Sequence, residues 1–326
     1  LVYKPEESFF TYGFGLYAIG GFGLNYPVSK TNPILNPQFP NGFGVGPLYS
    51  QYQVLQLAPT IAYKLTDEWS VGFQPNLDLS DLALDPAIFA DPTLIQGSTG
   101  QGPVYGDATH SRSRVGGGFQ LGAYYTPTES DWSFGASFKS PQWFETSTYP
   151  SVNPQGQAGR SKIDFDFPMI ASIGTAYRGI DRLLIALDLR YVGFRETNGY
   201  RETGFDSTGA LRGLGFQDIF ALSLGAQYRL TDQLTVRSGY SFNMNPIGNA
   251  VTSYNVASPL NLQNSLALGL SYDVTKALKI SASYVHFFQS TNNGPINEPF
   301  IGPLRNSDVR LATTADSLVI GVNVSF

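Results

Sequence analysis

The sequence contains no cysteine, only two histidines and two methionines, and few charged residues for its length. The absence of cysteine excludes disulfide-stapled folds and zinc–thiolate sites. Charged residues make up 14% of the chain, against about 25% in a typical soluble domain. No apolar run approaches the roughly 18 residues that a transmembrane helix needs. The chain is therefore short of solvating charge, yet it is not a helical membrane protein.

The balance of charge excludes another class of partner. The 25 acidic residues outnumber the 20 basic ones, which leaves a net charge of −5. A nucleic-acid-binding protein needs an excess of Lys and Arg to compensate the phosphate backbone, so we expect no nucleic-acid partner. Phosphate-binding loops, nucleotide fingerprints and metal-ligand spacings do not occur in the sequence. We therefore expect no cofactor and no metal site.

Glycine, tyrosine and phenylalanine are abundant, with 35, 19 and 23 residues. Apolar residues alternate with polar or small ones over stretches of roughly ten residues, as in 55–63, 220–228 and 266–272. A period of two indicates β-strands, and helical spacing is nearly absent. Period two is therefore the dominant order in this chain.

The connections between these stretches alternate in length. The short ones cover the following residues: Lys64–Glu68, Thr126–Asp131, Arg178–Arg182, Arg229–Gln233 and Asp273–Ala277. Long segments rich in Gly, Pro and Asn lie between them, at 26–50, 80–111, 140–161, 196–215, 243–263 and 289–316. Outer-membrane barrels combine short periplasmic turns with long extracellular loops in this way. Counting predicts about twelve strands, the first at 10–25 and the last at 317–326.

One tyrosine stands immediately before each short turn, on the apolar face of its strand: Tyr63, Tyr125, Tyr177, Tyr228 and Tyr272. The alternative is a soluble β-sandwich, but that fold gives no physical reason for five strand-end tyrosines to lie at one height. A membrane–water interface supplies that reason, because it favours a girdle of aromatic side chains. Tyr191, Tyr240 and Tyr284 are candidates for a second girdle at the opposite strand ends.

These patterns predict an all-β fold, a transmembrane antiparallel β-barrel of about twelve strands, with residues 1–326 forming a single barrel in the bacterial outer membrane. A closed barrel is the only β-structure that pairs every backbone group inside hydrocarbon. Outer-membrane lipid is therefore one expected partner. The terminal Phe326, after alternating apolar residues, resembles an assembly signal that the barrel-assembly machinery recognises.

The sequence also resembles a known family, the bacterial outer-membrane transporters of long-chain fatty acids and aromatic hydrocarbons (FadL/TodX-like). Two strand pairs carry the resemblance best, GFQDIFALSLGAQYRLTDQLTVRSGYSFNMNPI (215–247) and NSLALGLSYDVTKALKISASYVHFF (264–288). The final strand, DSLVIGVNVSF, matches as well, and LAPTIAYKLTDEWSVGFQPNL (57–77) and GGFGLNYP (20–27) match more weakly.

The resemblance implies a fourteen-stranded barrel plugged by a small N-terminal hatch. It also implies that a hydrophobic molecule is captured outside the cell and released sideways into the membrane. No hatch-like segment precedes Phe10, and the strand count is two short of the family pattern. We therefore expect the hatch and the first strands to be missing from this chain. A twelve-stranded barrel without a hatch is the alternative.

The loop 81–96 (DLALDPAIFADPTLIQ) is the first candidate for a ligand site. Its apolar residues are too many for an ordinary solvated loop: Leu82, Leu84, Ile88, Phe89, Leu94 and Ile95. Clusters of exposed apolar residues mark binding surfaces, and the resemblance places a capture groove on extracellular loops of this kind. Part of the loop could form a short helix with Pro86 at its first position. The alternative is a loop that packs its own small core over the barrel mouth.

The second candidate is a glycine-rich stretch near the end of the first strand. Its key residues are Gly20, Gly21, Gly23, Asn25 and Pro27. Glycine weakens or bulges a strand, and proline cannot donate to the ladder. A kink here would open the lateral exit that the resemblance implies. The alternative is a strand that simply ends at the rim, where Pro27 begins a loop.

The third candidate lies in the lumen. Alternation points several charged side chains inward, and Arg190 and Arg237 are the predicted contacts for the carboxylate of a fatty acid. A structural ladder of lumen charges is the alternative. A neutral aromatic hydrocarbon remains open as ligand, because acidic residues at least balance basic ones.

The predicted function is uptake of hydrophobic small molecules, either long-chain fatty acids or aromatic hydrocarbons, by binding-assisted passive diffusion with lateral release. Two other functions stay open: a general water-filled diffusion porin and an outer-membrane lipid hydrolase. The hydrolase would need a histidine-centred site, and the two histidines, His110 and His286, lack a convincing local triad. We therefore expect no enzymatic activity and no catalytic residue.

Overall fold

The computed structural model describes residues 1–107, 113–152 and 158–325. Within these residues the fold is nearly all β, and its main element is one antiparallel sheet of 14 strands. Two of these strands, β1 (Val2–Tyr3) and β9 (Trp143–Phe144), have only two residues each. The other twelve confirm the predicted strand count. None of the helices formed by the described residues is long and apolar enough to cross a membrane.

The twelve long strands are β2 (Phe10–Tyr26), β3 (Leu48–Lys64), β4 (Trp69–Asp85), β7 (Arg114–Tyr125), β8 (Trp132–Lys139), β12 (Met169–Ile180), β13 (Leu183–Gly193), β14 (Ile219–Arg229), β15 (Leu234–Asn243), β16 (Asn264–Asp273), β17 (Leu278–Gly294) and β20 (Val309–Val324). The long loops add the hairpins β5 (Thr93–Gly97) with β6 (Gly100–Val104), β10 (Ser147–Val152) with β11 (Ala158–Ile163), and β18 (Asn297–Glu298) with β19 (Gly302–Pro303). One 3₁₀ helix, η1, covers Asn249–Asn255.

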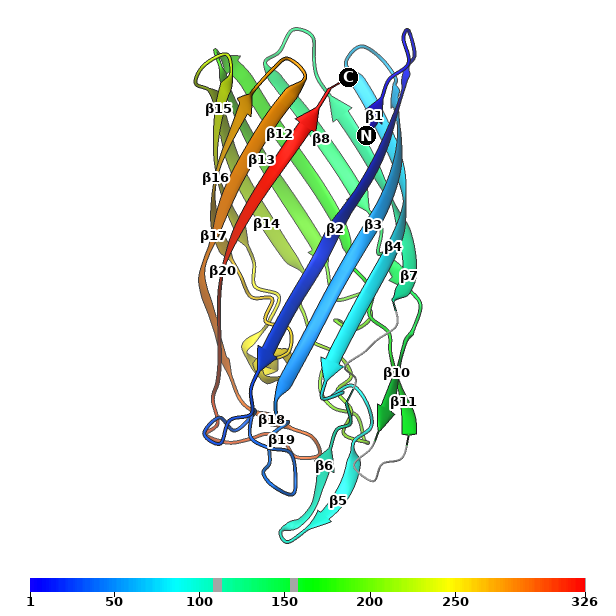
Figure 1. Ribbon diagram of the computed structural model, residues 1–326, viewed down its shortest axis with the longest axis vertical. Helices are drawn as coiled ribbons and strands as arrows, with labels where there is room; N and C mark the ends of the chain where they lie inside the picture. The colour runs from blue at the N-terminus through cyan, green and yellow to red at the C-terminus, as the bar shows by residue number, and fades with distance from the viewer. Residues whose placement is uncertain (108–112, 153–157, 326) are drawn as a thin grey trace.

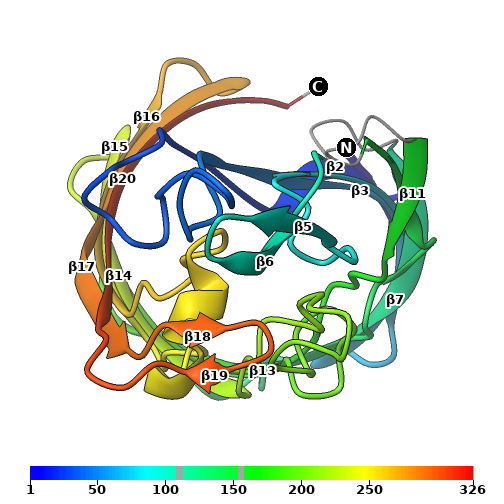
Figure 2. The ribbon, with the colours of Figure 1, turned by 90° about the horizontal axis from the view of Figure 1, so that it is seen from below.

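Each long strand pairs with the next one along the chain, and the sheet curls into a barrel. Figure 1 shows the short turns at one end and the long loops at the other, and Figure 2 shows the loops filling the mouth of the ring. We call these the turn end and the loop end. β2 and β20 are the last long strands at the two edges of the sheet, and no described backbone pair joins them. The ring is therefore not closed by hydrogen bonds at this seam.

The faces of the strands are reversed relative to a soluble protein. On β14 the side chains of Phe220, Leu222 and Leu224 are 51%, 45% and 51% exposed, and they face outward. Inside the barrel, by contrast, the polar side chains of Gln56 and Asp78 are fully buried. An apolar outer surface around a partly polar interior is the arrangement that lipid requires. The predicted transmembrane β-barrel is confirmed.

The five tyrosines before the short turns lie at one level, as the sequence predicts. Each pairs in register with the first residue of a neighbouring strand: Tyr63 with Phe10, Tyr125 with Trp69, Tyr177 with Trp132, Tyr228 with Leu183, and Tyr272 with Leu234. The rings of Tyr125 and Trp69 stack with centroids 4.5 Å apart. These cross-strand pairs form a continuous girdle at the turn end.

Several predicted boundaries were wrong at the loop end. The segment predicted as a loop from residue 80 continues as strand β4 to Asp85, paired with β3, and the described residues 86–92 form no helix. Likewise β17 runs to Gly294 and β20 begins at Val309, so the last loop is shorter than predicted. At the turn end, β12 continues to Ile180 and shortens the third turn. In β4 the alternation continues, but the apolar side chains of Leu82 and Leu84 face inward.

A β-bulge in β2 reverses the direction of its side chains. Ala18 pairs with Leu55 and Gly20 with Val54, so Ile19 has no partner on β3. Because side chains alternate with a period of two, one extra residue moves every later side chain to the other face. Beyond the bulge Phe22 and Leu24 therefore point into the barrel and pack against its core.

Candidate functional site

The interior at the loop end is filled by a cluster that we call the aromatic core. Its fully or nearly fully buried members include Tyr52, Phe165, Tyr200, Phe216 and Ile247, each 3% exposed or less. Their rings pack closely, with centroids 5.1 Å apart for Tyr52–Phe165 and 4.6 Å apart for Phe165–Tyr200. Strands and loops that are distant in sequence thus share one apolar interior.

The predicted capture residues divide into two groups. Leu82 and Leu84 lie on β4 and are buried, at 6% and 3% exposure. Phe89 is half-buried and packs against both the aromatic core and a second cluster built on Leu48, Leu84 and Ala257. Only Leu94, on the β5–β6 hairpin, is strongly exposed, at 50%. Ile95 on the same hairpin is half-buried. Leu82, Leu84 and Phe89 therefore contribute to the packed interior rather than to an exposed groove.

A cavity of about 410 Å³ opens among the long loops, and we call it the loop cavity. Its volume lies in the range of roughly 300–1,000 Å³ that is usual for small-molecule sites. Ile88 is the one predicted capture residue that lines it. The other apolar lining side chains come from separate loops and include Ile34, Phe39, Phe43, Phe205, Tyr254, Phe300 and Ile301. The second cluster forms its floor, because Leu48 and Ala257 belong to both.

Sequence reasoning missed most of this lining, although a signal was present. The loop between β2 and β3 carries Ile34, Phe39 and Phe43 among its prolines and glycines. The loop between β17 and β20 carries Phe300 and Ile301 side by side. These are apolar residues in otherwise polar loops, the same signal that marked 81–96. What the sequence could not supply was the convergence of the loops.

The electrostatics of the loop cavity depend on one carboxylate. Glu298, on β18, is half-buried, and burial raises the pKa of its carboxyl above the usual value. Burial raises the pKa of the Tyr105 phenol, and the negative charges of Glu298 and Asp206 raise it further. Tyr105 donates its hydroxyl to the Gly209 carbonyl at 2.7 Å. The described residues that line the cavity include no lysine, arginine or histidine.

On the turn-end side of the aromatic core, a group of hydrogen-bonded side chains lies in the interior against β3, β4 and β8. We call it the polar layer, and it consists of Gln56, Asn76, Asp78, Lys139 and Gln142. Gln56 donates to Asp78 at 2.7 Å and accepts from Lys139 at 2.9 Å. Gln142 accepts from Asn76 at 3.0 Å and from Gln56 at 3.3 Å. These bonds connect β3, β4 and β8 with the segment after β8, which therefore folds into the lumen.

The predicted exit residues lie beside this layer. Gly20, Gly21, Gly23 and Asn25 are on β2 beyond the bulge, and they remain paired with β3 as far as Tyr26. Pro27 follows the strand and begins the loop, as the alternative reading of this stretch expected. A Cβ placed on Gly20 would lie 2.9 Å from Cε2 of Phe167. The ring of Phe167 in turn lies 5.7 Å from Nζ of Lys139. The bulge, Phe167 and the polar layer thus meet at one height.

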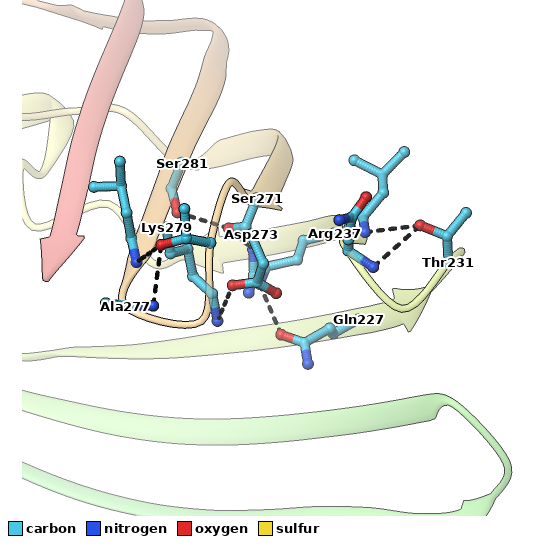
Figure 3. A network of polar contacts seen from close by, with 12 residues as sticks. Gln227, Thr231, Arg237, Ser271, Asp273, Ala277, Lys279 and Ser281 are labelled. Atoms are coloured by element: carbon cyan, nitrogen blue, oxygen red, sulfur yellow. Dashed lines mark hydrogen bonds and ion pairs between the residues drawn. The ribbon is translucent and has the colours of Figure 1, made fainter. Parts of the chain in front are cut away.

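The two predicted lumen arginines differ in position and partners. Arg190 lies near the loop end of β13, is exposed, and forms no hydrogen bond or ion pair with any residue that the structure describes. Arg237 lies near the turn end, where its guanidinium donates to Gln227 at 2.8 Å and to Ser271 at 2.6 Å (Figure 3). Ser271 contacts Ser281, and Lys279 pairs with Asp273 at 3.3 Å close by.

A third arginine, Arg114, sits inside the aromatic core and was not among the predicted contacts. It is 3% exposed and donates to Ser80 at 3.0 Å and to the Phe165 carbonyl at 3.2 Å. Its guanidinium carbon also lies 5.3 Å from the centroid of the Phe144 ring. Arg114 therefore joins β4, β7 and the inward-folded segment.

The histidines do not form a hydrolase site among the described residues. His286 lies on the outer face of β17, and its Nδ1 is 2.8 Å from Asp316 on β20, which also accepts from Tyr284. No serine completes this group in the described contacts. His110 and Phe326 lie outside the residues that the structure describes. Nor do the described side chains bring three His, Cys, Asp or Glu residues together as metal ligands.

Comparisons with known proteins agree on the fold. The toluene transporter TodX of P. putida superimposes with a TM-score of 0.68 at 15% identity, over 98% of this chain and 80% of that one. The toluene transporter TbuX of Ralstonia pickettii gives 0.65 at 18%, over 99% and 79%. A FadL homologue of Pseudomonas aeruginosa gives 0.65 at 18%, over 98% and 75%. Among curated proteins, none is significantly similar in sequence to this chain.

A family model settles the assignment. The model of the outer membrane protein transport proteins (OMPP1/FadL/TodX) matches residues 19–326, nearly the whole chain. The family consists of transport channels rather than enzymes. The chain therefore belongs to the OMPP1/FadL/TodX family, the β-barrel transporters of hydrophobic compounds in the bacterial outer membrane.

Proposed function

We propose that this protein takes up small hydrophobic molecules by passive, binding-assisted diffusion and releases them sideways into the outer membrane. The observation that carries the proposal is the division of the interior. It is apolar at the loop end, and the polar layer lies on the turn-end side of this apolar region. Transfer of apolar surface from water into an apolar environment lowers the free energy. A hydrophobic solute is therefore stabilised in the interior at the loop end, and it would lose that stabilisation at the polar layer.

Capture takes place in the loop cavity. Its aromatic and aliphatic lining removes a small ring compound from water, which stabilises binding by about 25 cal/mol for each Å² of apolar surface buried. Leu94 on the β5–β6 hairpin is an exposed apolar contact near the mouth. From the cavity an apolar route leads inward through Leu48 and Ala257, and Phe89 connects this second cluster to the aromatic core.

Release takes place beside the bulge of β2. On β3 the inward residue after Val54 is Gln56, so the apolar route ends at the height where Gly20 pairs with Val54. Glycines leave the outer surface of the barrel bare at this height, and the Phe167 ring occupies the inner side. Rotation of Phe167 would let a flat solute pass the barrel wall without crossing the polar layer.

For a solute with a carboxylate, Arg190 and Arg237 remain the proposed contacts. Arg190 is the stronger candidate of the two, because its guanidinium is free of competing hydrogen bonds to the described residues. Arg190 is exposed and has no described partner, whereas both hydrogen bonds of Arg237 to neighbouring strands would compete with a ligand. Arg190→Ala should then weaken binding of a fatty acid and leave binding of naphthalene unchanged. Equal binding of the fatty acid by both proteins would remove Arg190 from the pathway.

Binding is tested by fluorescence titration of the purified protein in nanodiscs with naphthalene. We expect saturable binding, competed by other monocyclic and bicyclic hydrocarbons. A linear, unsaturable signal that matches empty nanodiscs would overturn the proposed function.

Release is tested with Gly20→Ala, which places a methyl group against Phe167. We expect slower uptake of radiolabelled naphthalene by cells that express the variant, with unchanged affinity in nanodiscs. Gly321→Ala is the matched control, because an added Cβ at Gly321 meets no atom within 4 Å. Wild-type uptake by Gly20→Ala would remove the bulge from the exit route.

A further inference from the structure

The charge of the loop cavity is unusual for a site that would accept fatty acids. Its lining includes six aromatic residues, Phe39, Phe43, Tyr105, Phe205, Tyr254 and Phe300. Glu298 is the one acidic residue among the described residues of the lining, which include no Lys, Arg or His. A carboxylate held in an apolar space without a partner costs free energy, because it loses hydration. Such a group is stabilised by a hydrogen-bond donor or a cation.

No described residue fills this role for Glu298. Its carboxylate has no hydrogen bond or ion pair with any residue in the part of the chain that the structure describes. Two other carboxylates in the loops are paired: Glu202 with Arg212 at 3.1 Å, and Asp206 with the Thr208 hydroxyl at 2.6 Å. Within the described part of the chain, Glu298 is therefore an acceptor without a partner in the lining of an aromatic cavity.

The backbone around Glu298 is held firmly, so the carboxylate has a defined position. Glu298 pairs with Gly302 in the β18–β19 hairpin. The preceding Asn297 donates its side-chain amide to the Ala250 carbonyl at 3.0 Å and to the Ser253 hydroxyl at 2.9 Å. These bonds fix the hairpin to helix η1. An acceptor in a fixed position can select among ligands of the same size.

We propose that the loop cavity selects uncharged aromatic compounds that carry a hydrogen-bond donor, such as a phenolic hydroxyl or an aromatic amine, with the Glu298 carboxylate as acceptor, and that it rejects the corresponding carboxylates. The aromatic ring of the ligand packs among the phenylalanines. The donor forms a charge-assisted hydrogen bond with Glu298. A ligand carboxylate would instead bring a second negative charge into the same apolar space, where the described lining offers no cation to compensate it.

This inference rests on the proposed function, and three probes with one ring system separate the two. Naphthalene, 2-naphthol and 2-naphthoate are titrated against the protein in nanodiscs. We expect 2-naphthol to bind about tenfold more tightly than naphthalene, as a hydrogen bond to a charged group implies. We expect 2-naphthoate to bind more weakly than either.

Variants of Glu298 assign the selectivity to this side chain. Glu298→Leu should remove the advantage of 2-naphthol over naphthalene, and Glu298→Gln should improve binding of 2-naphthoate. Glu202→Gln is the matched control, because Glu202 is a loop carboxylate that does not line the cavity. Its three affinities should equal those of the wild type. Heat-modified gel migration checks that each variant has folded into a barrel.

The outcomes are distinct. If the wild type binds none of the three probes saturably, the proposed function fails, and the inference fails with it. If naphthalene binds but 2-naphthoate binds as tightly as 2-naphthol, only the inference fails. The same holds if Glu298→Leu keeps the wild-type order of affinities.

Discussion

The loop end and the turn end of the barrel interior are formed by the same strands, yet their side chains differ in kind. At the loop end Tyr52 and Ile247 are each 2% exposed inside the aromatic core. At the turn end the lumen carries Arg237, Asp273 and Lys279, and the last two are 39% and 46% exposed (Figure 3). The polar layer separates the two regions. A hydrophobic solute is thus stabilised in one half of the lumen only, which favours a lateral exit over passage to the turn end.

The sharpest test of this comparison introduces the same charge at both ends. Ile247→Lys places an unpaired ammonium in the aromatic core and should lower the free energy of unfolding by about 3–5 kcal/mol, because the ion loses its hydration. Thr235→Lys, at the second residue of β15 beside the short turn and on the same inner face as Arg237, should change it by less than about 1 kcal/mol. Urea unfolding in lipid measures both. Equal costs at the two positions would show that the ends do not differ in polarity.

Removing the polar layer tests whether it separates the two ends. The double variant Gln56→Ala, Gln142→Ala loses several hydrogen bonds and should cost about 1–3 kcal/mol of stability. It should also raise ion conductance in planar bilayers, whereas the wild type should be nearly silent. Gln227→Ala, at the turn end, serves as control and should stay silent. Steady conductance by the wild type would instead favour a water-filled diffusion porin.

A smaller effect is expected from the lining of the loop cavity. Phe43 is 73% exposed, and its ring centroid lies 6.1 Å from that of Phe39 across the lining. Phe43→Ala should weaken naphthalene binding about 2- to 10-fold, which is the contribution of one aromatic contact. Phe9→Ala changes an exposed phenylalanine at the turn end and should leave the affinity unchanged. The capture site would have to be placed elsewhere if both variants bound equally.

The smallest effect is expected at Arg237. Arg237→Ala removes two hydrogen bonds in a wet part of the lumen and should cost about 1 kcal/mol of stability. Naphthalene affinity should not change, because the residue lies on the far side of the polar layer. Circular dichroism during urea unfolding and the nanodisc titration measure the two quantities. A loss of naphthalene affinity would mean that the ligand reaches the turn end.

Most of the outer barrel could be predicted from local pattern. The alternation around Phe220, Leu222 and Leu224 needs only the rule that one face meets lipid, and the structure confirms it. The tyrosines before the turns also followed from sequence, because strand ends that meet one flat interface must share one height. Here each residue's environment depends on parity and on distance from a turn, and both are readable along the chain.

The loop end resisted prediction for three physical reasons. The bulge at Ile19 adds one residue and reverses the parity of everything after it in β2, so Phe22 faces the core. The strands of the loop end bury apolar side chains inward, so Leu82 and Leu84 look in sequence like part of an apolar loop. The cavity itself is formed where separate loops converge. The alternation of apolar and polar residues along a strand does not predict which loops meet.

The sequence by itself determined the class of fold, the number of long strands, the membrane-facing surface and the girdle, because these depend on short-range periodicity and on the chemistry of the bilayer. Only the tertiary structure decided what the interior contains. It placed Arg190 and Arg237 at different heights, brought Phe167 against Gly20, and put Glu298 in a cavity lined by aromatic rings. Such contacts join residues that are far apart in the chain, and their geometry is set by the curvature of the whole barrel.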